Sequence, residues 1–349
     1  MLENIGWDDE VAAASARWEA PDAAVGRVVR VDRGVAQVLT EAGPQRCGLG
    51  GAVLADLAAD PTSGPTTGDW VVLRSWPDHR STVEHVLPRR TAVLRAGAGK
   101  SSHGQVLVAN ADVVAVVVAL HPEPVAAKVE RLLALAWESG AGVVLVLTKA
   151  DLVTDAELVA EDLAAVAPGA RVLVTSTATG AGVGDLREVV GSGTLALLGA
   201  SGHGKSSLTN ALVGAEVLAT RTIREDGRGR HTSVRRELVP LPGGGAVVDL
   251  PGLRGVGLLD AGTGLARAFA DVDALAGRCR FDDCAHDQEP GCAVTAAVAD
   301  GTLPVRRFES WRRLQRELAR ETHRAESRLR LERRRAERTA RARRRTEDG

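Results

Sequence analysis

The sequence predicts a multidomain protein: a small β-barrel first, then an α/β domain on a parallel sheet, then a metal-binding helical part. Three observations support this. Short alternating apolar stretches fill residues 24–95, apolar strands alternate with helices between residues 105 and 250, and three cysteines gather with a histidine between residues 279 and 292. A chain of 349 residues is long enough for two or three domains with buried cores.

Four apolar stretches in the first part have the length and alternation of strands. They are separated by segments containing Gly, Pro or Asp, a spacing that is typical of a small barrel. The predicted strands are residues 26–31, 35–39, 69–73 and 82–87. Residues 1–22 have no clear period, so we expect a flexible N-terminal extension.

The middle part alternates continuous apolar runs with amphipathic segments. Continuous β-branched runs are typical of strands buried on both faces, so the alternation predicts a parallel sheet covered by helices on both sides. The predicted strands are 113–120, 143–147, 172–174, 195–198 and 246–250, and the predicted helices are 125–138, 156–165, 183–190 and 205–213.

A phosphate-binding P-loop follows the strand at 195–198. Gly199 is followed by four residues and then by Gly204-Lys205-Ser206, at the start of a predicted helix. Backbone N–H groups of such a loop converge on phosphate oxygens, the lysine reaches the β- and γ-phosphates, and the serine ligates Mg²⁺. The alternative is a chance glycine-rich turn. The expected phosphate-binding residues are Gly199, Ala200, Ser201, Gly202, His203, Gly204, Lys205, Ser206 and Ser207.

Two segments after the P-loop extend the phosphate site. Asp249 ends an apolar strand and is expected to hold the Mg²⁺ shell, while the Gly252 N–H faces a γ-phosphate. Between the P-loop and Asp249, the polar loop 220–236 contains Thr232, which would also ligate Mg²⁺ if the loop folds over the nucleotide. The alternative for this loop is an ordinary exposed connection.

Two segments before the P-loop indicate guanine recognition. Thr148 and Lys149 precede Asp151 after a predicted strand, and the Asp151 carboxylate can accept hydrogen bonds from the N1–H and 2-amino groups of guanine. Adenine lacks this donor pair, so the site would select GTP, with the Lys149 stem over the base or ribose. Ser176 and Thr177 follow the next strand and would present a backbone N–H to the guanine oxygen.

Three thiolates and one imidazole form a candidate metal site. The spacing of Cys279, Cys284, His286 and Cys292 satisfies closed tetrahedral zinc, which is structural rather than catalytic. We expect one Zn²⁺ per chain; the alternative is three free cysteines near a surface histidine. Cys47 stands alone and is expected to be a small buried apolar residue.

Charge and hydropathy indicate which partner and which compartment to expect for the protein. Residues 305–349 carry 17 arginines and eight acidic residues, so the rest of the chain is acidic, at −10, within a net charge of −1. A basic tail on an acidic body favours a nucleic-acid partner, although a solvated, salt-bridged helix has the same composition. The sequence has no membrane-spanning run and no signal core, so we expect a cytoplasmic protein. We also expect a monomer.

The order of these motifs is unusual, because the guanine-reading segments come before the P-loop. With a barrel in front and a Cys₃His cluster behind, residues 24–320 resemble the RsgA family, the ribosome small-subunit-dependent GTPases. The resemblance implies an OB-fold barrel at 23–98, a circularly permuted GTPase domain at 99–260, and a zinc domain with a basic helical tail at 261–349. It also implies GTP hydrolysis to GDP, stimulated by the 30S subunit, in late 30S maturation with 16S rRNA as partner.

Several residues depart from the family pattern. Thr148 stands where asparagine is usual, Thr177 where alanine is usual, and His203 at a P-loop position that is usually apolar. Leu253 follows Gly252 where Ras-like enzymes carry a water-positioning glutamine, and a leucine cannot orient water. Lys205 and Thr232 are therefore expected to act in catalysis with His231, the match to the family's switch histidine.

Two other functions remain open at this point. One is a non-catalytic, GTP-dependent RNA-binding switch whose weak turnover only resets it. The other is an assembly GTPase for the large ribosomal subunit, against which the barrel and the zinc module argue.

Overall fold

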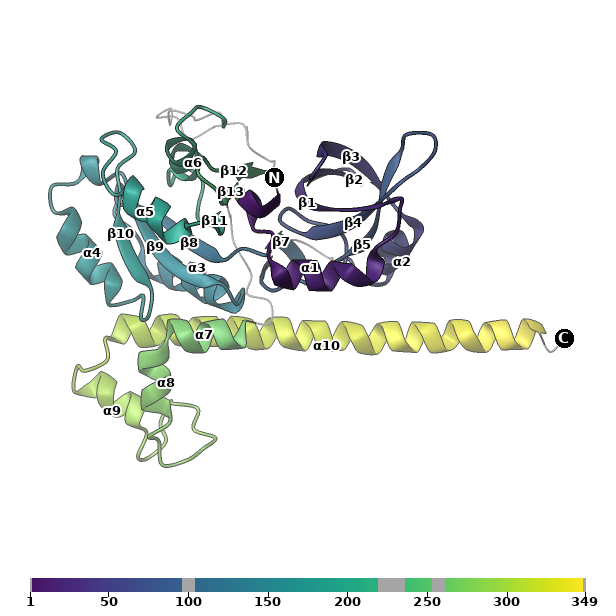
Figure 1. The fold of residues 1–349 in the computed structure, drawn as a ribbon. Helices are drawn as coiled ribbons and strands as arrows, with labels where there is room; N and C mark the ends of the chain where they lie inside the picture. The colour runs from purple at the N-terminus through teal and green to yellow at the C-terminus, as the bar shows by residue number, and fades with distance from the viewer. Residues whose placement is uncertain (1, 96–103, 219–235, 253–260, 348–349) are drawn as a thin grey trace, which may run out of the picture.

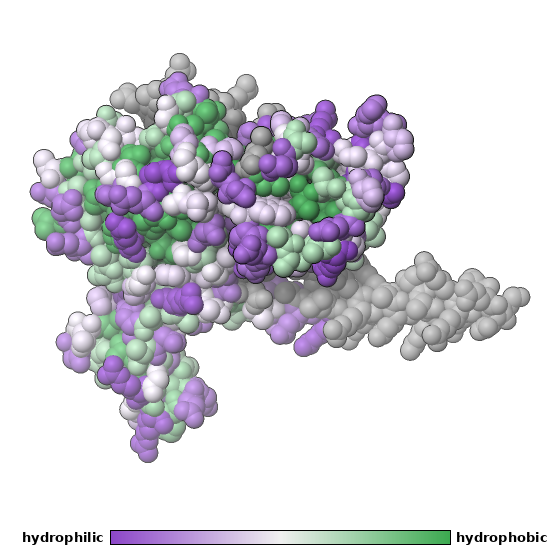
Figure 2. All heavy atoms as spheres, viewed as in Figure 1, coloured by the Kyte–Doolittle hydropathy of each residue, from purple (hydrophilic) through white to green (hydrophobic). Residues whose placement is uncertain are grey.

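The computed structural model describes residues 2–95, 104–218, 236–252 and 261–347 (Figure 1). The barrel lies beside the α/β domain, and a long C-terminal helix runs beneath both, with the short helices α8 (Ala270–Ala276) and α9 (Ala293–Ala299) below it. Among the described residues, no helix has the length and apolar character required to cross a bilayer. On the face drawn in Figure 2, hydrophobic residues are scattered among hydrophilic ones over both domains.

The N-terminal segment is helical, where the sequence predicted flexibility. It forms η1 (Leu2–Ile5), α1 (Asp9–Ser15) and η2 (Ala16–Trp18). Asp8 caps α1 by accepting a hydrogen bond from the Val11 N–H, and Leu2, Ile5 and Val11 are buried against Trp70 of the barrel. The spacing of these apolar residues follows no single period, because they lie in two short helices that are separated by a turn. These helices therefore leave no periodic pattern in the sequence from which they could be predicted.

The predicted barrel is present and closed, with strand order β1-β2-β3-β5-β4. The buried Cys47 lies in its core, as expected, and burial raises the pKa of its thiol to about 11. Its third strand was missed because it begins Gly-Pro and contains few apolar residues. The elements are β1 (Ala23–Asp32), β2 (Val35–Thr40), β3 (Gly43–Leu49), α2 (Gly51–Ala59), β4 (Trp70–Ser75) and β5 (Ser81–Val86).

The α/β domain is built on a six-stranded sheet of order β10-β9-β8-β11-β13-β12, in which only the edge strand β12 is antiparallel. A two-stranded sheet, β6 with β7, connects it to the barrel. The strands are β6 (Ala92–Arg95), β7 (Gln105–Ala109), β8 (Val113–Ala119), β9 (Gly142–Thr148), β10 (Arg171–Val174), β11 (Thr194–Leu198), β12 (Leu238–Pro240) and β13 (Ala246–Asp249).

Both faces of the large sheet are buried, which explains the continuous apolar runs. Val114, Val116 and Val118 face one core cluster, whereas Ala115 and Val117 face the other. The first cluster is covered by α3 (Ala126–Glu138) and α4 (Ala156–Ala164), and the second by α5 (Val183–Val190) and α6 (Lys205–Val213). The short helix η3 (Ala150–Leu152) follows β9.

The C-terminal part packs on the first of these faces through α3. Helix α7 (Gly262–Ala268) approaches α3 so closely that a Cβ at Gly264 would lie 2.1 Å from the Ala134 carbonyl oxygen. Helices α8 (Ala270–Ala276) and α9 (Ala293–Ala299) lead to α10 (Val305–Glu347). The first turns of α10 add Phe308 and Leu314 to the core, while its distal part extends beyond the domains (Figure 1).

Candidate nucleotide and metal sites

The P-loop connects β11 to α6, as predicted. Gly202 and Gly204 have φ of +82° and +85°, a left-handed conformation that side chains disfavour. A Cβ at Gly199 would lie only 2.4 Å from the Val117 carbonyl oxygen. No side chain caps the start of α6, so its first N–H groups are available to an anion at the positive end of the helix.

Lys205 is folded into the loop that it follows. Its ammonium donates to the carbonyl oxygens of Gly199 at 3.1 Å and Ala200 at 2.9 Å, and the residue is 6% exposed. Burial lowers the pKa of Lys205, and the nearby Asp249 carboxylate opposes this shift. The loop therefore holds a buried cation next to the uncapped helix end, which is a setting for a polyanionic ligand.

Ser206 and Asp249 meet beside this lysine. The Ser206 hydroxyl donates to Asp249 Oδ2 at 2.6 Å, whereas Asp249 Oδ1 is buried and has no hydrogen-bond partner among the described residues. Burial raises the pKa of Asp249, and the Ser206 hydrogen bond and the Lys205 charge partly offset this. A hydroxyl with an unpaired carboxylate oxygen is a donor set that suits a hard cation such as Mg²⁺.

The second phosphate motif lies against the P-loop. A Cβ at Gly252 would lie 2.6 Å from the Ser201 backbone nitrogen, so only a glycine permits this approach. Two other predicted participants, His231 and Thr232, lie outside the described residues, as does Leu253.

The two guanine motifs come together at the carboxyl ends of β9 and β10. Ser176, which is buried, donates from its hydroxyl to Asp151 Oδ1 at 2.5 Å. Asp151 itself is exposed, so its carboxylate is oriented by Ser176 yet open to a ligand, and Thr177 beside it is also exposed. Lys149 adopts a left-handed φ of +61° between them. This geometry presents a fixed acceptor of the kind that the N1–H and 2-amino groups of guanine require.

Thr148 does not join this group. Its hydroxyl donates instead to the carbonyl oxygen of His203 in the P-loop, at 2.7 Å, and the residue is 2% exposed. This contact could not be predicted from side-chain patterns, because the acceptor is a backbone atom that every residue type carries.

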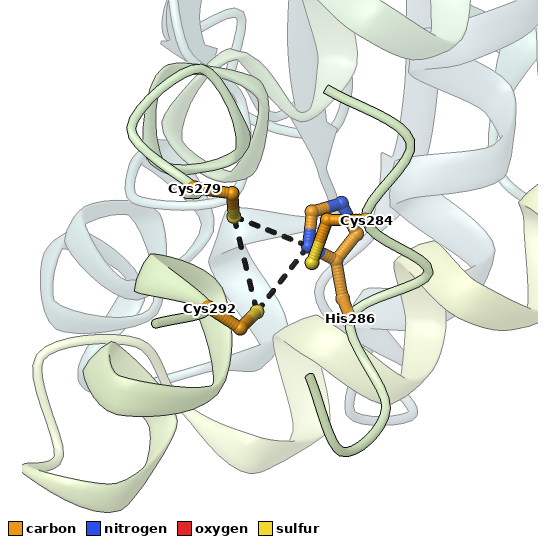
Figure 3. Close-up of side chains that lie close together, drawn as sticks. All are labelled: Cys279, Cys284, His286 and Cys292. Atoms are coloured by element: carbon orange, nitrogen blue, oxygen red, sulfur yellow. Dashed lines mark hydrogen bonds between the residues drawn. The ribbon is translucent and has the colours of Figure 1, made fainter. Parts of the chain in front are cut away.

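The four predicted metal ligands converge, with ligand atoms all within 4.8 Å of one another (Figure 3). Cys279 Sγ lies 3.8 Å from Cys292 Sγ and 3.5 Å from His286 Nδ1, and the last two atoms are 3.4 Å apart. Ligands ~2.3 Å from a tetrahedral ion have separations of roughly this size. Cys284 completes the set. Although burial raises the pKa of Cys292, hydrogen bonds from Thr295 and neighbouring ligands bring it down to about 6.

Comparisons with known proteins identify relatives of this chain. The family model described as RsgA GTPase matches residues 86–259. The small ribosomal subunit biogenesis GTPase RsgA of Streptomyces coelicolor is 48% identical over 94% of this chain and 89% of that protein. RsgA 2 of Lactiplantibacillus plantarum is 41% identical over 84% of this chain and 83% of its own.

Solved structures match the fold as well. YjeQ from Thermotoga maritima superposes with a TM-score of 0.61 at 26% identity, covering 85% of this chain and 99% of its own. YloQ, described as a circularly permuted GTPase, has a TM-score of 0.59 at 22% identity, covering 85% of this chain and 95% of its own, and supports the permuted fold. From these similarities, the chain belongs to the RsgA GTPase family.

Proposed function

We propose that this protein hydrolyses GTP to GDP and phosphate on the small ribosomal subunit, as a checkpoint late in subunit maturation. One observation carries the proposal. The phosphate-binding residues Lys205, Ser206 and Asp249 and the guanine-reading Asp151 all lie at the carboxyl ends of parallel strands of one sheet, with only β8 between β9 and β11. The names of the relatives, which are small ribosomal subunit biogenesis GTPases, supply the particle.

Different residues are proposed to bind the base, the phosphates and the magnesium ion. Asp151 accepts hydrogen bonds from the guanine edge, Lys149 covers the base or ribose, and the backbone of Ser176 and Thr177 faces the guanine oxygen. Lys205, the P-loop amides and the Gly252 N–H hold the phosphates. Ser206, Asp249 and Thr232 would hold Mg²⁺, which when bound neutralises charge on the β- and γ-phosphates.

Water activation is the step for which the described residues offer the least. We infer that His231 acts on the attacking water once the 30S subunit orders its loop, because Leu253 cannot. Slow turnover of the isolated protein is expected, because Leu253 stands where Ras-like enzymes carry the glutamine that orients the attacking water. Replacing His231 with alanine is expected to abolish the 30S-stimulated rate and leave GDP binding unchanged.

We also propose that arginine contacts to phosphates hold 16S rRNA and that the protein acts as a monomer. The described part of α10 exposes Arg313, Arg316 and Arg320. Phosphate neutralisation releases counterions, so affinity for the 30S particle is expected to fall steeply with salt. Binding measured at 50 and 200 mM salt checks this.

The Cys₃His cluster is proposed to hold one structural zinc ion. Separations of 3.4–3.8 Å between three of the ligand atoms favour a tetrahedral ion. Metal analysis of the purified protein should give one zinc per chain. Chelation, or Cys279→Ser, should unfold the region around α8 and α9 and lower the thermal midpoint. A protein without metal that melts as the holo form does would contradict the assignment.

GTPase assays with and without purified 30S and 50S particles test the central proposal. The expected result is low intrinsic turnover, strong stimulation by 30S, and none by 50S. Stimulation by 50S alone would support a large-subunit factor. GTP-dependent 30S binding without stimulated hydrolysis would support a non-catalytic switch. Lys205→Ala is the matched control for hydrolysis by this site rather than by a contaminant.

A further inference from the structure

Thr148, the first residue of the guanine motif, points toward the phosphate end of the site. It is the last residue of β9, and its hydroxyl donates to the His203 carbonyl oxygen at 2.7 Å. A second acceptor, the Val118 carbonyl, lies at 3.5 Å, too far to compete. A Cβ added at Gly204 would be 3.3 Å from Thr148 Oγ1, so the side chain packs directly under the loop. One hydroxyl hydrogen engaged in this way is not available to the base.

His203 is held by a second strand through its ring. The imidazole Nδ1 lies 3.0 Å from the carbonyl oxygen of Val117 in β8, which requires Nδ1 to carry the proton. The same carbonyl faces Gly199 at the other end of the loop. His203 therefore connects to β9 through its carbonyl and to β8 through its ring.

The P-loop needs such support because its own sequence gives it little. Two of its residues, Gly202 and Gly204, are left-handed glycines, and α6 begins without a side-chain cap. Glycines are the most costly residues to immobilise, yet the loop amides must stay aligned on the phosphates. Contacts from two neighbouring strands supply that alignment from outside the loop.

We propose that Thr148 and His203 are positioning residues that fix the P-loop to β9 and β8, and that Thr148 does not read the base. This rests on the proposed function only in taking the loop as the phosphate site. The pair ties the guanine end of the site to its phosphate end, since Thr148 lies three residues before Asp151. Loss of the Thr148 hydroxyl should thus loosen the P-loop and weaken phosphate binding.

Two variants isolate the hydroxyl. Thr148→Val keeps the shape and removes the donor, whereas Thr148→Ser keeps the donor. The first measurement is amide hydrogen exchange of residues 199–207 in nucleotide-free protein, where Thr148→Val should exchange at least fivefold faster than wild type and Thr148→Ser close to it. The second is affinity for GDP and for IDP, which lacks the 2-amino group. Thr148→Val should weaken both about five- to tenfold, as expected for one net hydrogen bond, and leave their ratio unchanged.

Asp151→Asn is the matched control, because it should change the GDP-to-IDP ratio without changing exchange in the loop. His203→Leu removes only the ring contact and should give a smaller rise in exchange. Thr148→Val should still act in that background, since the residue 203 carbonyl remains. A GDP-to-IDP ratio altered by Thr148→Val, or loop exchange equal to wild type, overturns the inference. If wild type binds neither nucleotide, the proposed function fails, while the exchange measurement still decides the positioning role.

Discussion

Two buried arginines, Arg27 and Arg307, join the parts of this molecule in different ways. Arg27, 1% exposed, donates to three backbone carbonyl oxygens: those of Ile5 in the N-terminal segment, Gly68 in the barrel and Asn110 in the α/β domain. Three segments far apart in the sequence therefore share one guanidinium.

Arg307 of α10, 2% exposed, instead pairs with carboxylates. It donates to Glu130 Oε1 of α3 at 3.0 Å and to Asp271 of α8 at 2.7 Å, besides the Ala268 carbonyl. Arg306 shares Glu130 from a more exposed position. The guanidinium thus connects α8 and α10 to α3, the helix that covers the sheet.

The partners set the charge balance of each junction. Burial lowers the pKa of Arg27 to about 10, with Asp112 opposing, so it remains protonated at neutral pH. Burial also lowers the pKa of Arg307, but hydrogen bonds to Asp271 and Glu130 outweigh it and raise the value. Carbonyl partners belong to the backbone and cannot be substituted, whereas carboxylate partners can. The two junctions should therefore respond differently to compensating mutations.

The largest expected effect is at Arg307. Arg307→Met leaves Glu130, which is fully buried, with Arg306 as its one remaining ion-pair partner among the described residues, and loss of one member of a buried pair costs about 3–5 kcal/mol. Urea unfolding and hydrogen exchange of α7 to α10 measure this. Arg306→Met, at a side chain 48% exposed, should cost far less. A cost below about 1 kcal/mol for Arg307→Met would be inconsistent with a buried ionic junction.

Arg27→Met should cost somewhat less, about 2–3 kcal/mol, because the carbonyls lose their donor but no charge is left unpaired. The thermal midpoint and the exchange of α1 amides report it. Arg27→Lys, with one donor group in place of a fork, should recover only part of the loss. Full recovery by lysine would mean that charge rather than hydrogen-bond number matters at this junction.

Compensation should then separate the two junctions. In Arg307→Met, adding Glu130→Leu removes the buried carboxylate that has lost Arg307 and should restore about 2 kcal/mol of the loss, because apolar replacements of buried pairs are often neutral. Arg27→Met has no carboxylate partner to remove, so Asp112→Asn should give no recovery. A double-mutant cycle on urea midpoints tests both, and equal rescue at the two sites would erase the distinction.

The smallest effect is the pH dependence. Burial raises the pKa of Asp271, but its hydrogen bonds to Arg307 reverse this and hold it below the ordinary 3.8. A lowered pKa stabilises the fold above the unfolded value, and this is lost as the pH falls through the folded value. The gap between wild type and Asp271→Asn should thus close below about pH 4. A stability difference that stays constant with pH would mean that the substitution acts through packing rather than through the carboxylate charge.

Local sequence patterns predicted the parts of this molecule that have a regular apolar spacing or a recognisable binding motif. The β-branched run around Val116, the glycine spacing of the P-loop and the four metal ligands all depend on side chains, so the sequence displays them. What it could not display depends on backbone atoms. The Thr148 contact ends on a carbonyl, as do the three contacts of Arg27. The N-terminal helices were missed because only the folded barrel gives Leu2 and Ile5 a surface to pack on.

The long helix α10 has a mechanical consequence. Its last residue in the core layer is Leu318, and it continues to Glu347. At ~1.5 Å per residue, the free arm is roughly 44 Å long. A tilt of about 5° at Leu318 would move the far end by about 4 Å, more than the length of a hydrogen bond. Small rearrangements beside the sheet are therefore magnified into displacements that a distant partner can sense.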